Sequence, residues 1–221
     1  MRAYALLFSV MAVLLTGCAK KADWHQKMVL YFDTPDGPIT ASSVIRVDFT
    51  GAMAWAGDLN HDHTDLIGEA VVADLGGRYL FALIEEDAGR MIVRALPQDK
   101  KEQSFKSSII WIKKQTEPLE LPMSLWPRMV TFKDVKNPTT VELVDPANIA
   151  AAFNDGFSLS RVTIQVTEEP LTKGRVVAAL NSAFFRDGAA MRKAALSRGS
   201  NDKYFEFLAA ELTRNKFIRE E

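Results

Sequence analysis

The chain has 221 residues, an apolar fraction of 48%, a formal charge of -1 at pH 7 and one cysteine. This is the composition of an ordinary globular protein, with enough apolar residues for a sizeable core. The balanced charge provides no basic surface, which excludes nucleic acid as a partner, and a lone cysteine excludes an internal disulfide.

The N-terminus has the features of an export signal. Met1-Arg2 supplies a positive start, and an almost unbroken apolar run extends from Ala3 to Leu15. This run is shorter than the roughly 20 residues that a membrane-spanning helix needs, and it fits the apolar region of a signal peptide. We therefore predict a signal peptide over residues 1–17.

The four residues Leu15-Thr16-Gly17-Cys18 resemble the lipobox of bacterial lipoproteins. The resemblance implies diacylglyceryl transfer to the Cys18 sulfur, cleavage after Gly17 and acylation of the new amino group. The acyl chains would anchor the protein to membrane lipid on the periplasmic side of the bacterial envelope, and Ala19 after the cysteine favours the outer over the inner membrane. The alternative is an ordinary signal peptide or membrane anchor with a chance cysteine.

Two hairpins are predicted early in the chain. After a polar tether over residues 18–26, a domain is expected over residues 27–221, beginning with a strand at 28–33 and returning at 43–49. Thr34-Pro35-Asp36-Gly37 is a strong turn between these strands. Gly76-Gly77 separates strands expected at 69–75 and 78–84 and suits a type I′ turn.

The remaining elements follow in chain order. Apolar runs and alternation predict four further strands, at 90–96, 107–112, 140–144 and 161–167. Residues 115–128 are expected to be an extended connector. A short helix is predicted between Asp145-Pro146 and Gly156, and helical spacing of apolar residues predicts two C-terminal helices, one carrying Val177, Leu180 and Phe184 and one over 205–212.

Strands followed by helices indicate an α+β fold, mainly an antiparallel sheet of hairpins with helices towards the C-terminus. One domain is expected, and a helical subdomain from about residue 170 is the alternative. Four segments, TPDG, GEAVVADLGGRYLFALI, FKDVKNPTTVELVDP and FNDGFSLSRVTIQVTEEPLTKG, resemble a group of uncharacterised proteobacterial lipoproteins and secreted proteins. The resemblance implies an exported domain.

The segment GDLNHDHTDLIGE, residues 57–69, is the strongest sequence signal for a metal site. In a calcium loop of EF-hand type, Asp58, Asn60 and Asp62 would be ligands and Glu69 would stand twelfth. The sixth position of such a loop requires glycine and is His63 here, which disfavours this assignment.

The same segment resembles the H-x-H-x-D motif of metallo-β-lactamase-type hydrolases through His61, His63 and Asp65. In that family the histidines hold one zinc and the aspartate a second, which implies a metal-activated water. Catalytic zinc needs more protein ligands, yet His25 is the only other histidine of the chain. We therefore expect a solvated loop with both histidines at its tip and no metal or other cofactor.

Motifs for nucleophilic catalysis and for nucleotide binding are absent from the sequence. The leading expectation is a non-enzymatic, membrane-anchored envelope lipoprotein that acts by binding, or as a structural component, towards an envelope protein or ligand. The alternatives are a metal-dependent envelope hydrolase using the His61, His63 and Asp65 segment, and a small-ligand carrier with a cavity between its sheet and its C-terminal helices.

Overall fold

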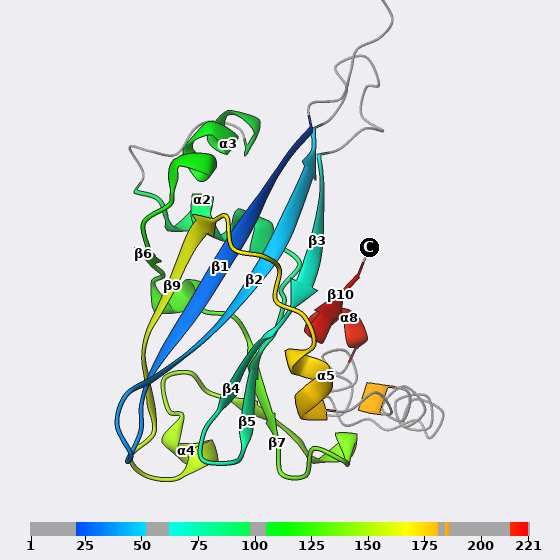
Figure 1. Ribbon diagram of the computed structural model, residues 1–221. Coiled ribbons are helices and arrows are strands. Elements are labelled where there is room, and N and C mark those ends of the chain that lie inside the picture. Colours follow the sequence, from blue (N-terminus) through cyan, green and yellow to red (C-terminus); the bar gives the residue numbers. More distant parts are fainter. Residues whose placement is uncertain (1–20, 52–61, 98–104, 181–183, 186–212, 221) are drawn as a thin grey trace, which may run out of the picture.

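The computed structural model describes residues 21–51, 62–97, 105–180, 184–185 and 213–220 (Figure 1). The described strands form two antiparallel sheets with short helices packed against them, which confirms the α+β class. In spatial order the first sheet consists of β10 (Ile218–Arg219), β3 (His63–Glu69), β2 (Ile39–Thr50), β1 (Lys21–Asp33), β9 (Ser158–Thr167) and β6 (Leu119–Glu120). The second consists of β4 (Val71–Asp74), β5 (Tyr79–Ala82), β7 (Met129–Phe132) and β8 (Val141–Val144). The helical segments are η2 (Ala88–Arg90), α2 (Met91–Ala95), α3 (Phe105–Lys114), η4 (Met123–Leu125), η5 (Pro138–Thr140), α4 (Ala150–Phe153), α5 (Arg175–Leu180) and α8 (Arg214–Phe217).

The first hairpin, β1–β2, is confirmed, but β1 begins earlier than predicted. Its turn closes with the Gly37 N–H donating to the Thr34 carbonyl oxygen at 3.0 Å. The tether prediction for residues 18–26 is wrong from Lys21 onwards, because β1 starts there and the side chains of Trp24 and Gln26 are buried. The segment is rich in polar residues and was therefore not predicted as a strand, but its alternate side chains, Trp24 and Gln26, point into the core.

The second hairpin, β4–β5, has the predicted turn. Gly76 and Gly77 both have positive φ, at 70° and 86°, as a type I′ turn requires. Ahead of it, β3 passes directly into β4, so the chain crosses from the first sheet to the second at this point. Gly68 makes that crossing possible, since an added Cβ would lie 3.0 Å from the backbone Cα of Ile45.

Two predicted strands are helices. Residues 90–96 form the end of η2 together with α2, and residues 107–112 lie within α3. In α3, Ser108 and Ile112 are buried one helical turn apart while Ile110 between them is exposed, which is a helical period. Short apolar runs cannot be assigned to helix or strand by periodicity alone. The described helices are therefore not confined to the C-terminal part of the chain, as the sequence had predicted.

The later elements agree in part. Strands β8 and β9 are confirmed, and the connector 115–128 contains the short β6 and η4. Helix α4 starts at Ala150 rather than at the Asp145-Pro146 pair, and its C-cap residue is Asn154, which has φ 83°. Within α5, Val176 and Leu180 are buried, whereas Val177, which was predicted to share the face of Leu180, is exposed. The helix predicted over 205–212 lies outside the described residues.

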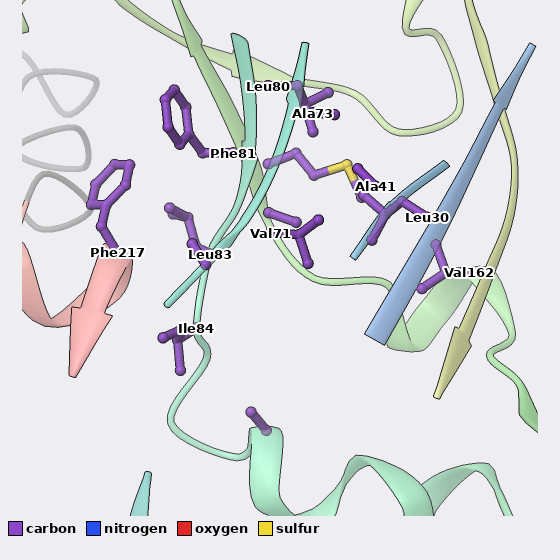
Figure 2. Packing of buried hydrophobic residues seen from close by; sticks show 14 of the residues in the cluster. Leu30, Ala41, Val71, Ala73, Leu80, Phe81, Leu83, Ile84, Val162 and Phe217 are labelled. Carbon is purple, nitrogen blue, oxygen red and sulfur yellow. The ribbon is translucent and has the colours of Figure 1, made fainter. Parts of the chain in front are cut away.

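The core lies between the two sheets and extends beyond the second one. Leu30 and Val162 of the first sheet face Val71 and Leu80 of the second (Figure 2). The opposite face of the second sheet is covered by C-terminal residues, and five phenylalanines pack there edge to face or tilted, with centroids 5.0–6.4 Å apart: Phe81, Phe132, Phe184, Phe185 and Phe217. Both faces of the two central strands of the second sheet, β5 and β7, are therefore buried.

Arg78 joins the second hairpin to its neighbours. Its guanidinium donates to a Glu142 carboxylate oxygen at 2.7 Å and to the Ala152 carbonyl oxygen, and it lies 5.2 Å from the centre of the Phe153 ring. Lys133 contacts the same carboxylate at 2.7 Å. Hydrogen bonds from Lys133 and Arg78 hold the pKa of Glu142 below its ordinary value, against an opposing effect of burial.

Candidate functional site

The predicted site residues are only partly described. Cys18 and His61 lie outside the described residues, whereas His63 and Asp65 lie on β3. The prediction of a solvated loop over 57–69 is therefore wrong for residues 63–69, which pair with β2 and β10. The spacing of two residues places both side chains on the same, solvent-facing side of the strand, where His63 Nε2 lies 2.9 Å from Asp65 Oδ1 and the side chains are 70% and 63% exposed.

Three aspartates lie abreast beside this pair. Asp23 of β1 is directly opposite Asp48 of β2, which is directly opposite Asp65 of β3. Arg46 pairs with Asp48 at 2.9 Å, so the row is partly neutralised. We call these three residues the aspartate row. Neighbouring strands are about 4.8 Å apart, so Asp23 and Asp65 belong to strands about 10 Å apart. This separation disfavours one ion that is bound by all three carboxylates.

The remaining histidine belongs to a different contact on the same face. His25 Nδ1 lies 2.7 Å from the Glu169 carbonyl oxygen, and the Glu169 carboxylate accepts a hydrogen bond from Lys27 at 2.6 Å. These contacts fasten the segment after β9 onto β1. Within the described part of the chain, no three His, Cys, Asp or Glu side chains are grouped so that they could hold a metal ion.

An open groove of about 560 Å³ lies between α2, η4 and the adjoining ends of β7 and β8. Its lining comes from segments 85–94, 124–129 and 143–146, none of which contains a sequence motif for catalysis or ligand binding. This volume is within the range of about 300–1,000 Å³ that is usual for ligand sites. Leu143, which lines the groove, is among the exposed large apolar side chains.

The groove combines apolar walls with fixed charges. Asp87 and Arg94 form an ion pair at one side. Glu85 accepts a hydrogen bond from Lys216 of α8 at 3.2 Å, and its other carboxylate oxygen is buried with no hydrogen-bond partner among the described residues. The Trp126 indole N–H donates to the Leu121 carbonyl oxygen at 2.9 Å, which fixes the ring in the groove wall. Such a surface fits a ligand with both apolar and charged groups.

The space between the sheets is much smaller. A cavity bounded by Gln26, Ser43 and Glu69 on the first sheet and by Val71 and Ala82 on the second has a volume of about 30 Å³. About 10–15 Å³ of such space holds one water molecule, so this cavity has room for about two. A carried ligand therefore has no room at this position. The second predicted C-terminal helix, over 205–212, lies outside the described residues.

Glu69 is a buried carboxylate whose role was not predicted from the sequence, where it was only the twelfth position of a possible calcium loop and the first residue of an expected strand. It is 6% exposed, and it accepts hydrogen bonds from the backbone N–H groups of Gly174, Arg175 and Val176 at 2.6, 2.8 and 3.1 Å. These are donors at the N-terminus of α5, where a carboxylate is favourable. The carboxylate thus caps a helix that follows it by more than 100 residues along the chain.

Comparison of the chain with protein-family models, with curated proteins and with solved structures finds no match. Among the described helices, none combines the length and the apolar content that crossing a bilayer requires.

Proposed function

We propose that the protein is a lipid-anchored lipoprotein of the bacterial envelope that acts by binding and performs no catalysis. The N-terminal support is the lipobox Leu15-Thr16-Gly17-Cys18, which follows a signal-like apolar run. Acylation of Cys18 attaches the periplasm-facing domain to the membrane, and two or three acyl chains form a stable anchor. Ala19 favours the outer membrane.

The observation that supports binding most strongly is the open groove between α2, η4 and the second sheet. The groove is open to solvent, and its lining includes the exposed apolar side chain of Leu143 and the Asp87–Arg94 ion pair. An exposed apolar patch rimmed by charges is typical of a protein-interaction site. We infer that the groove accepts a segment of another envelope protein that carries both apolar and charged side chains.

The anchor is tested by metabolic labelling with a fatty-acid analogue. The wild-type protein should be labelled and membrane-bound, and Cys18→Ser should be unlabelled and should accumulate as the uncleaved precursor. A matched control, Cys18→Ser combined with Asp36→Cys, keeps one thiol but places it at the exposed β1–β2 turn, and it should also be unlabelled. A labelled Cys18→Ser protein would show that the proposed anchor is wrong.

Binding through the groove is tested by crosslinking in cells. A photoreactive amino acid at Leu143, inside the groove, should give one discrete adduct, and the same amino acid at Asp36, exposed on the β1–β2 turn, should not. Reversal of the rim charge by Arg94→Glu should reduce the Leu143 adduct. Identical adducts from both positions, or none from position 143, would refute the groove as the binding surface.

A further inference from the structure

Helix α3 carries an unusual outward face. Ser108 and Ile112 are buried against the rest of the protein. At 100° per residue, Ile110 lies opposite these two, with Lys113, Lys114 and Trp111 around it. Ile110 is 65% exposed and Trp111 is 39% exposed, and the Lys114 ammonium lies 5.8 Å from the centre of the Trp111 ring. We call these four side chains the α3 face.

Helix α3, which carries this face, lies at the same end of the molecule as the first residues of β1 (Figure 1). Three peptide links separate Cys18 from Lys21, the first residue of β1. Such a link spans at most about 11 Å when fully extended. Acyl chains on Cys18 therefore hold this end of the domain against the bilayer, and α3 with it.

The chemistry of the α3 face matches the surface of a bilayer. Tryptophan is enriched at the level of the lipid headgroups because its ring is amphipathic. Lysine extends its ammonium to the phosphates while its methylenes stay in the apolar layer, and an anionic leaflet attracts it. The aspartate row lies at this end too, on the solvent-facing side of the first sheet, whereas α3 packs beside α2 and β9. Carboxylates are repelled by an anionic leaflet, so the aspartate row disfavours contact on its side even though Asp48 is paired with Arg46.

We propose that the α3 face rests on the phospholipid headgroups of the membrane that holds the acyl chains of Cys18. This inference depends on the proposed anchor. It adds a second contact, which fixes the orientation of the domain on the membrane: α3 lies on the bilayer and the aspartate row is turned away from it.

Depth-dependent fluorescence quenching tests this orientation on the full, acylated chain. Because Cys18 is the only cysteine and its sulfur would carry the diacylglyceryl group, Ile110→Cys introduces a single reactive thiol for an environment-sensitive dye. The labelled protein is reconstituted into vesicles of phosphatidylethanolamine and phosphatidylglycerol that contain a headgroup-proximal spin-labelled lipid. The dye at position 110 should be quenched several-fold more strongly than the same dye on an Asp36→Cys protein, since position 36 is at the far end of β1.

A charge variant provides the second readout. Lys113→Glu with Lys114→Glu should reduce the quenching at position 110 in these vesicles and change it little in vesicles of phosphatidylcholine alone. If acylated protein enters the vesicles but positions 110 and 36 are quenched equally, the α3 face is not a lipid contact and the anchor stands. If the wild-type protein carries no acyl chain and stays out of the vesicles, the proposed anchor itself fails.

Discussion

Removal of the Glu69 carboxylate should be among the most destabilising single changes in the described part of the fold. The side chain is buried and accepts three backbone hydrogen bonds at the N-terminus of α5. A hydrogen bond to a charged group contributes about 1.5–3 kcal/mol, and a buried donor left without a partner costs about 1–3 kcal/mol. Allowing for water that replaces part of these contacts, Glu69→Ala should lower the free energy of unfolding by about 3–5 kcal/mol.

Glu69→Gln separates charge from shape. The amide keeps the size of the side chain and one acceptor oxygen, but its NH₂ group meets backbone N–H donors, so we expect a loss of about 1.5–3 kcal/mol. Urea unfolding followed by circular dichroism measures both variants. Glu168→Gln, at an exposed position, is the matched control and should stay within about 0.5 kcal/mol of wild type. A Glu69→Ala protein as stable as this control would refute the capping role.

Three further predictions follow from the described contacts. Gly68→Ala should lower the free energy of unfolding, measured with urea, by about 2–4 kcal/mol, because its φ of 140° is unfavourable for other residues and its Cβ would meet the backbone of β2. A neutral effect would contradict the tight crossing between the sheets. The pKa of Glu142 is lowered in the folded protein by Lys133 and Arg78, so its contribution to stability is full above the ordinary glutamate pKa of about 4.3 and is lost as the pH falls through the lower folded value. Glu142→Gln should therefore flatten the acid limb of a stability–pH curve, and an unchanged curve would show that these pairs add nothing. Zinc content of the purified protein, measured by mass spectrometry, should be far below one ion per chain and unchanged by His63→Ala; stoichiometric zinc that this change removes would instead support the hydrolase alternative.

The sequence predicted the elements whose local chemistry is unambiguous. Gly37 and the Gly76-Gly77 pair mark tight turns, and alternation identified β2 and β9. The α2 and α3 segments were assigned to strands because an apolar run of about five residues carries too few periods to distinguish a helix from a strand. Tertiary packing decides there, through the burial of Ser108 and Ile112 on one side of α3.

The functional surfaces were harder to predict for a related reason. The groove is assembled from three segments that are distant in the chain, and none of them has an unusual composition. Glu69 is paired with backbone donors more than 100 residues away, and backbone N–H groups have no sequence signature. By contrast, the H-x-H-x-D spacing of His61, His63 and Asp65 is easy to recognise in a sequence. The described pair, His63 and Asp65, is nevertheless exposed on an ordinary strand.

The early start of β1 limits where a partner can meet the proposed lipoprotein. A tether over residues 18–26 would let the domain move away from the membrane, whereas a strand that begins at Lys21 leaves only a link of about 11 Å. From that point β1 runs for 13 residues, or about 43 Å at 3.3 Å per residue. Helix α2, which forms one wall of the groove, lies within this span (Figure 1), so an anchored domain can bind only partners that come to the membrane surface. An envelope protein held at the same membrane meets this condition at high local concentration, since confinement to one surface raises the effective concentration of both partners.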